Sequence, residues 1–250
     1  MAQNPSIVAE NTGIGRVVHA QWRYMPSYGI EFVADAAKAD LRVAHANGTT
    51  VEDLDILHSH GLYWTGDVGS GSYATWHHTI NQRIIADIRR ARAFTVPSKW
   101  VGEPFRREMG RYPKIIGHGI DVEQWGGEDK RWGYVLWNKN RAADVCDPVP
   151  AWELAERGIL VVSTFAPSGR PIAENMRVTG QLSAPNMKSL IQKASIYLAT
   201  TKETFGIGTL EAMACGVPVL GYDWGGTAEL VSHKYNGYLV KPGDIDGLVE

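Results

Sequence analysis

Short apolar runs alternate with helix-like segments along the chain, and this alternation constrains the fold more than any other feature of the sequence. Runs this short are typical of buried strands and are too short for helices. They predict strands at 115–116, 134–137, 159–162, 178–180, 196–199, 217–220 and 238–240, with helices between them such as 151–157 and 186–194. Strands that alternate with helices indicate parallel α/β architecture, in which ligands bind beyond the carboxyl ends of the strands.

The length and charge of the chain limit the classes of protein to which it can belong. Its 250 residues can form two domains, and a polar, glycine-rich stretch at 121–133 predicts a boundary, with domains at 1–121 and 122–250. A formal net charge of −2 without a block of like charges argues against nucleic acid or an anionic membrane as a partner. The two cysteines are far apart, and we find neither signal-peptide features nor an apolar run that could span a bilayer. We therefore expect a cytoplasmic protein without a transmembrane segment.

Two glutamates frame a turn between a predicted strand and a predicted helix. Glu203 follows the strand at 196–199, and Glu211 lies in the first turn of a helix at 209–215. Gly206 and Gly208 form the turn between them, where free backbone N–H groups at a helix N-terminus can bind phosphate. This arrangement suits a ligand with hydroxyl groups on both sides of a diphosphate, which describes a nucleotide sugar. The alternative is that both carboxylates only stabilise the helix dipole.

The segment from Lys202 to Val219 resembles the Glu-x7-Glu signature of retaining GT-B glycosyltransferases of family four, the glycosyl transferases group 1. Further motifs fit the same family in order, at 217–220, 225–229, 236–240 and 242–244, and more weakly at 57–61, 76–79, 96–101 and 117–121. The resemblance implies two Rossmann-like parallel-sheet domains, with the donor held by the C-terminal domain and the acceptor by the N-terminal one. It implies metal-independent transfer of a sugar from a nucleotide-diphosphate sugar with retention, forming an α-linkage.

The resemblance also assigns roles to single residues. By it, Glu203 contacts the transferred sugar and His78 approaches that sugar from the N-terminal domain, which makes them the expected catalytic residues. It implies that Glu211 binds the ribose hydroxyls. The full set of expected donor-binding residues is Gly13, Gly15, Lys139, Arg141, Phe205, Gly206, Ile207, Gly208 and Glu211.

Lys139 and Arg141 follow the strand predicted at 134–137 and can share one side of an extended segment. Cations there would stabilise the charge that develops on a diphosphate leaving group. The family uses an arginine and a later lysine for this purpose, and Lys139 stands in for that lysine here. A solvated pair of loop charges is the alternative. Gly13 and Gly15 resemble the family's first glycine loop, although an ordinary tight turn would explain them as well.

Four histidines lie close together in the sequence, at His58, His60, His77 and His78. Two histidines separated by one residue lie on the same face of a strand and could bind a metal. No cysteine cluster or carboxylate with ligand-like spacing accompanies them, so we expect no metal and no other cofactor besides the donor substrate. His77 could also replace His78 in the catalytic role. The Asp-x-Asp pairs at 53–55 and 244–246 mimic a metal motif and are expected to be structural.

The chain departs from the family in two ways. It is short for a GT-B enzyme, and it stops where a helix begins, at 244–250. The resemblance therefore implies a reduced N-terminal domain and missing C-terminal helices. Two alternative functions stay open: a nucleotide-sugar epimerase, and a catalytically silent subunit that binds a nucleotide sugar or acts as a scaffold. The sequence predicts neither the donor sugar and base nor the acceptor, which could be a sugar, a lipid or a protein, nor the oligomeric state.

Overall fold

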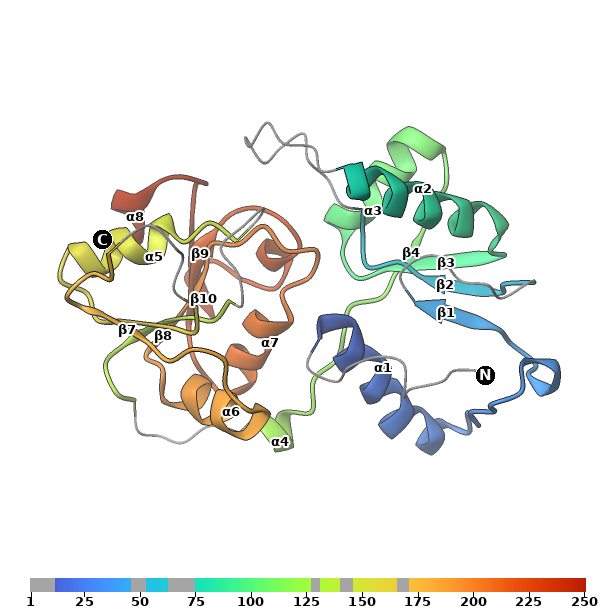
Figure 1. Cartoon of the computed structure of the whole chain (residues 1–250), viewed down its shortest axis with the longest axis horizontal. Helices are drawn as coiled ribbons and strands as arrows, with labels where there is room; N and C mark the ends of the chain where they lie inside the picture. The colour runs from blue at the N-terminus through green and yellow to red at the C-terminus, as the bar shows by residue number, and fades with distance from the viewer. Residues whose placement is uncertain (1–11, 46–52, 63–74, 127–130, 140–145, 166–170) are drawn as a thin grey trace. The chain divides into compact units, whose positions relative to one another are not determined.

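The computed structural model describes residues 12–45, 53–62, 75–126, 131–139, 146–165 and 171–250. The chain forms two compact units, Met1–His118 (unit 1) and Gly119–Glu250 (unit 2). Each unit contains its own parallel sheet, as Figure 1 shows. The predicted α/β class with parallel sheets is therefore confirmed.

Unit 1 is built on four parallel strands in the order β1-β2-β3-β4. The strands are β1 (Val43–His45), β2 (Ile56–His58), β3 (Ala93–Val96) and β4 (Lys114–Ile115). In Figure 1, α2 (Thr75–Arg90) and α3 (Lys99–Met109) lie on one side of this sheet and α1 (Gly13–Tyr24) lies on the other. This unit also contains the short helices η2 (Met25–Tyr28) and η3 (Ala36–Lys38).

The apolar core of unit 1 lies between the sheet and helices α2 and α3. Leu57 and Phe94 pack there against Ile88 and Phe105 from the two helices. Because side chains alternate between the faces of a strand, the neighbours of Leu57 and Phe94 in sequence point to the opposite face. His58, which follows Leu57, therefore lies on the α1 side of the sheet.

Unit 2 is built on six parallel strands in the order β10-β9-β8-β5-β6-β7. The strands are β5 (Val135–Trp137), β6 (Val161–Ser163), β7 (Met176–Val178), β8 (Ile196–Ala199), β9 (Val219–Tyr222) and β10 (Gly237–Val240). The chain starts in the middle with β5, adds β6 and β7 on one side, and then returns to add β8, β9 and β10 on the other. The direction of strand addition therefore reverses between β5 and β8.

Helices cover both faces of the sheet in unit 2. They are α4 (Val122–Trp125), α5 (Val149–Glu156), α6 (Ala184–Lys193), α7 (Ile207–Ala214), α8 (Ile245–Val249) and the 3-10 helix η4 (Thr227–Glu229). On one face, Leu136 packs with Ile191 of α6 and Ala212 of α7. On the other face, Trp137 packs with Trp152 of α5 and Leu248 of α8. Adjacent residues of β5 thus point into separate cores, as expected of a strand covered by helices on both sides.

Strands of unit 2 differ by up to two residues from the sequence prediction: β6 covers 161–163 rather than 159–162, and β7 covers 176–178 rather than 178–180. β9 begins at Val219 rather than at residue 217, because Pro218 has no N–H to donate to a neighbouring strand. β7 ends at Val178 rather than at residue 180, and Gly180 takes the left-handed conformation with φ +72°. The strand predicted at 196–199 coincides with β8.

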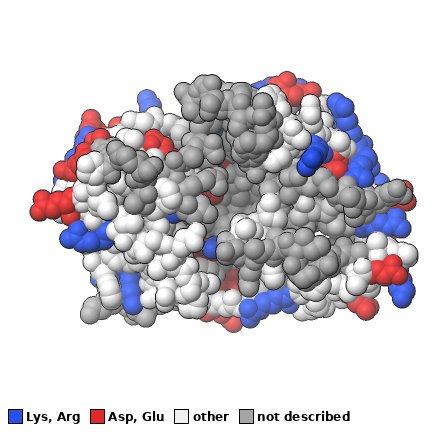
Figure 2. All heavy atoms as spheres, in the orientation of Figure 1, with Lys and Arg blue, Asp and Glu red and all other residues white. Residues whose placement is uncertain are grey.

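Charges of both signs are mixed over the face that Figure 2 shows, in agreement with the small net charge. Within the described residues, every helix is too short or too polar to cross a bilayer.

Candidate functional site

The loops that follow β5 and β8 meet where the strand order of unit 2 reverses. Ligands of open α/β sheets bind at such a point, outside the carboxyl ends of the strands. Lys139 lies two residues after the end of β5, and Glu203 follows β8. The topology therefore brings together two residues that the sequence predicted for the donor site.

Lys139 and Glu203 form an ion pair. The Lys139 ammonium donates a hydrogen bond to Oε1 of Glu203, and the two side chains are 9% and 33% exposed. Burial disfavours the charged form of Lys139, but the Glu203 carboxylate outweighs it and raises the pKa of Lys139 above its usual value. Thr164 holds the same loop, since its hydroxyl donates to the backbone carbonyl of Lys139 at 2.5 Å. Lys139 is thus a positioned cation that stays protonated at neutral pH.

The N-terminus of α7 follows Glu203 in the chain after three residues. Gly206 is its N-cap with φ +96°, and a glycine has no side chain to cap the first N–H groups of this helix. A Cβ at Gly206 would lie 2.5 Å from Oγ1 of Thr227, so both the conformation and the space require glycine. Ile207 and Gly208 occupy the first turn, where backbone N–H groups have no acceptor within the helix. Such a helix start attracts phosphate.

Two glycines after β9 fix the backbone of Glu203. The Gly226 N–H donates to the carbonyl oxygen of Glu203 at 2.8 Å. A Cβ at Gly226 would lie 2.1 Å from the carbonyl oxygen of Thr204, and one at Gly225 would lie 2.8 Å from that of Glu203. The two loops therefore pack backbone against backbone, and close approach is the reason for this glycine pair.

Glu211 lies in the second turn of α7, not in the first turn as predicted, because the helix starts at Ile207. Its side chain is buried, with only 3% of the residue exposed. The helix dipole acts mainly within the first turn, so it gives little reason for a carboxylate here. The position of Glu211 therefore gives the dipole explanation little support.

Phe205 and Gly208 contribute to the shape of the turn. Phe205 is buried, and a Cβ at Gly208 would lie 2.4 Å from the phenol oxygen of Tyr197 in β8. Tyr197 was not predicted as a site residue, and as an apolar position of a strand it gave no signal in the sequence.

The remaining predicted residues lie elsewhere or outside the described part. Gly13 and Gly15 belong to the first turn of α1 and not to a loop, because the Thr12 hydroxyl caps this helix by accepting from the Gly15 N–H at 2.9 Å. His78 lies exposed in the first turns of α2 in unit 1. Arg141 and the side chain of His77 lie outside the described residues.

The histidines of unit 1 gather differently from the sequence prediction. His58 and His60 contact His45 and His118, with ring centroids 4.7 Å apart for His45–His58 and 5.6 Å apart for both His45–His60 and His60–His118. We call these four residues the histidine cluster. His45 and His118 were missed because they come from β1 and from the segment after β4, and only the sheet brings them together.

The described contacts do not suit a metal ion in the histidine cluster. Nδ1 of His45 and Nε2 of His60 face each other at 3.2 Å in a hydrogen bond. An ion between them would lie about 1.6 Å from each, whereas zinc needs about 2.0–2.1 Å to nitrogen. Within the described residues, no group of three histidine, cysteine or acidic side chains could hold a metal.

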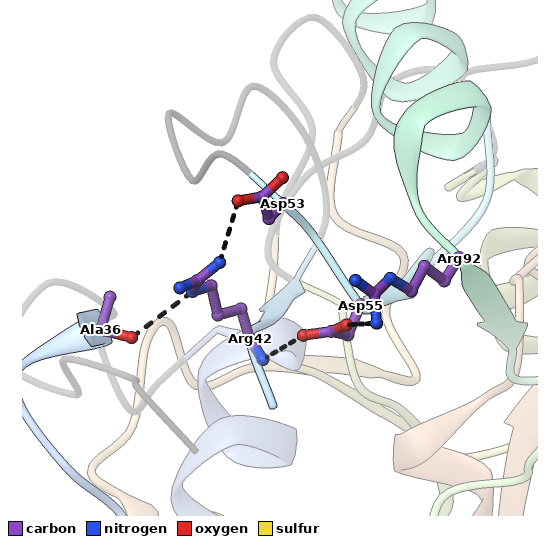
Figure 3. A network of polar contacts seen from close by, with 5 residues as sticks. All are labelled: Ala36, Arg42, Asp53, Asp55 and Arg92. Atoms are coloured by element: carbon purple, nitrogen blue, oxygen red, sulfur yellow. Dashed lines mark hydrogen bonds and ion pairs between the residues drawn. The ribbon is translucent and has the colours of Figure 1, made fainter. Parts of the chain in front are cut away.

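The two Asp-x-Asp pairs have structural partners. Figure 3 shows Asp53 and Asp55 with Arg42, whose guanidinium lies 3.3 Å from Asp53 and whose backbone N–H donates to Asp55 at 2.9 Å. Arg92 adds an ion pair to Asp55 at 3.1 Å. In the second pair, Asp244 caps α8 and Asp246 pairs with Arg157. The first pair thus connects the segments that precede β1, β2 and β3, and the second caps α8 and connects it to the end of α5.

Comparison with known proteins relates the C-terminal third of the chain to one family. Residues 169–250 match the model of "Glycosyl transferases group 1". The chain is 41% identical over 66 residues to N-acetyl-alpha-D-glucosaminyl L-malate synthase of Bacillus anthracis, covering 26% of this chain and 17% of that protein. It is 32% identical over 89 residues to D-inositol 3-phosphate glycosyltransferase of Jonesia denitrificans, covering 30% and 21%. The chain therefore matches only about a fifth of the length of these relatives.

Solved structures share the fold over most of this chain. TarM has a TM-score of 0.65 at 14% identity and covers 80% of this chain and 43% of its own. Sucrose-phosphate synthase from Thermosynechococcus elongatus has a TM-score of 0.64 at 17% identity, with 94% and 67% covered. Anabaena HepE in complex with UDP-glucose has a TM-score of 0.60 at 20% identity, with 78% and 60% covered. The predicted GT-B fold is confirmed.

Proposed function

We propose, from the premise that this chain belongs to the glycosyl transferases group 1 family, that it transfers a sugar from a uridine-diphosphate sugar to an acceptor with retention of configuration. The family supports the reaction class, and the UDP-glucose complex of HepE supports uridine as the base. The name of one relative contains L-malate and that of the other contains D-inositol 3-phosphate. Because these compounds differ, the names do not identify the acceptor of this chain.

The observation that carries this proposal is the ion pair of Lys139 and Glu203 before the N-terminus of α7. When the bond between the sugar and the diphosphate breaks, negative charge develops on the phosphate oxygens. The Lys139 ammonium and the N–H groups of Ile207 and Gly208 would stabilise this charge, and such fixed donors are usually the largest catalytic contribution. Lys139 would then share its donors between Glu203 and the phosphate.

Glu203 is the proposed sugar-binding residue. Its carboxylate is one-third exposed and its backbone is fixed by Gly226, so it can accept hydrogen bonds from sugar hydroxyls in one orientation. We assign the ribose hydroxyls to the buried Glu211. His78 and Arg141 keep the roles that the family resemblance implies, as proposals. Donor binding by Gly13 and Gly15 is proposed from the first turn of α1 instead of from a loop.

Isothermal titration calorimetry with UDP tests the donor site. Lys139→Gln removes the cation, and Lys241→Gln, an exposed residue of the same unit, is the matched control. A hydrogen bond to a charged group contributes about 1.5–3 kcal/mol, so Lys139→Gln should raise the Kd for UDP about 10- to 100-fold. Equal affinity of both variants and the unmodified protein would refute the proposed site.

Turnover distinguishes the alternative functions. Release of UDP that requires an acceptor and gives an α-linked product is the expected result. Binding of UDP-sugars without turnover over a broad acceptor panel would favour the silent subunit. An isomerised nucleotide sugar, formed without any acceptor, would favour the epimerase.

A further inference from the structure

The histidine cluster of unit 1 has a side-chain arrangement that the donor site does not explain. His45, His58 and Thr95 are register partners on the adjacent parallel strands β1, β2 and β3. Register partners point to the same face, which here is the face opposite the apolar core. The three side chains therefore form a polar row towards α1, at the carboxyl ends of β1 and β2.

The hydrogen bonds of this row fix where the protons of His45 and His60 lie. Oε1 of Gln21 in α1 can only accept, so Nε2 of His45, at 3.0 Å, donates to it. Nδ1 of neutral His45 is then an acceptor, and Nε2 of His60 donates to it at 3.2 Å. His58 bonds to the Thr95 hydroxyl through Nδ1 at 2.5 Å. Both ring nitrogens of His45 are thus engaged, and it cannot be protonated without breaking a bond.

Two ring nitrogens of the cluster make no hydrogen bond to any other described residue. Within the described residues, Nδ1 of His60 and Nε2 of His58 have no hydrogen-bond partner. Both side chains are partly exposed, as is that of His118. A proton added at Nδ1 of His60 would leave the bonds to His45 and Gln21 intact. His60 is therefore the imidazole of this cluster that can become a cationic donor without rearrangement.

The four imidazoles of the histidine cluster are uncharged at neutral pH when no ligand is bound. Burial, and then the neighbouring imidazoles, lower the pKa of His45 to about 2, of His60 to about 3 and of His118 to about 4. Burial alone lowers the pKa of His58. Only burial and other histidines cause these shifts, so no carboxylate of the described residues acts as a counter-charge. A ligand could supply that missing negative charge.

We propose that His58, His60 and His118 bind a small anionic group, a phosphate or a carboxylate, carried by the acceptor of the transfer reaction. His60 donates from Nδ1 after taking up a proton, and Nε2 of His58 donates when the Thr95 hydroxyl donates to Nδ1. The ring of His118 lies next to His60, with centroids 5.6 Å apart, and forms part of the wall of the site. The anion offsets the cost of the charge on His60. The assignment to the acceptor rests on the proposed function, whereas the anion site itself does not.

Nuclear magnetic resonance of the histidine ring protons tests the site on the whole chain. The probes are sulfate, a phosphate analogue whose charge is constant between pH 6 and 8, and acetate. We expect either anion to shift the signals of His58, His60 and His118 and to raise the pKa of His60. Uptake of one proton should tighten binding by up to about tenfold for each unit that the pH falls.

Variants separate this site from non-specific binding. His60→Gln and His118→Asn should each weaken sulfate binding at least about tenfold, whereas His233→Gln, an exposed histidine of unit 2, should not. Unperturbed cluster signals at saturating sulfate, unchanged affinity of both variants, or one-to-one binding of Zn²⁺ without sulfate binding would each overturn the proposal. Titration of the same sample with UDP reports on the donor site, so failure of one assignment leaves the other measurable.

Discussion

Acid should destabilise unit 1 selectively, because its histidine cluster is held neutral. His45, His60 and His118 have folded pKa values of about 2, 3 and 4, below the ordinary value of 6.5. The unfolded chain therefore binds more protons than the folded one below pH 6.5. The stability that these groups contribute is fully present above pH 6.5 and is lost as the pH falls below it.

The size of this effect follows from the unfolded pKa. At pH 5 each imidazole would be protonated in the unfolded chain and neutral in the folded one, which costs about 2 kcal/mol relative to pH 7. Three such groups give at most about 6 kcal/mol, comparable to the total stability of a typical domain of about 5–15 kcal/mol. We therefore expect unit 1 to unfold near pH 5 while unit 2 remains folded.

Hydrogen exchange measured by mass spectrometry at pH 7, 6 and 5 resolves the two units. Peptides from α2 and β3 should lose protection first, and peptides from β8 and α7 should keep it. His45→Gln should reduce the pH dependence by up to about 1.4 kcal/mol for each pH unit, and His233→Gln should leave it unchanged. Equal protection of both units at pH 5, or the same slope in His45→Gln, would refute the reasoning.

Three substitutions in unit 2 give further predictions. Glu203→Gln should abolish most transfer but retain UDP affinity in calorimetry, because it removes a sugar contact and frees Lys139 for phosphate; normal turnover would contradict this. Glu211→Gln should raise the Kd for UDP about 10- to 100-fold without lowering the apo Tm, whereas a purely helix-stabilising role predicts the reverse. Arg131→Met should lower the free energy of unfolding by about 2 kcal/mol in urea titration, because Arg131 donates to Gln192 and Cys215 at the C-terminal ends of α6 and α7; unchanged stability would exclude this capping.

The turn from β8 to α7 was the most predictable part of the site. The strand 196–199 and the glycines at 206 and 208 are local signals, and local signals determine where a strand or a turn lies. The helix start was placed two residues late, because Gly206 serves as a left-handed N-cap that sequence propensity does not anticipate. The same error placed Glu211 in the first turn.

The contacts between distant segments could not be predicted. Lys139 and Glu203 are 64 residues apart, and only the reversal of strand order joins them. Likewise, the register of β1 with β2 brings His45 to His58. For Gly13 and Gly15, by contrast, a local signal was available, since a threonine before a helix is a common N-cap and Thr12 marks the start of α1.

The charged groups of the two units respond differently to pH. We therefore expect the KM values of the donor and of the acceptor to differ in their pH dependence. Lys139 stays protonated because Glu203 raises its pKa, so binding of UDP-glucose, a diphosphate diester without a titrating phosphate, should be constant between pH 6 and 8. The histidine cluster gains affinity for an anion only by taking up a proton, so KM for an anionic acceptor should rise with pH over the same range. Steady-state kinetics with each substrate varied in turn measures both. A KM for UDP-glucose that changes tenfold per pH unit, with a constant KM for the acceptor, would show that titration acts on the donor side and would refute this division.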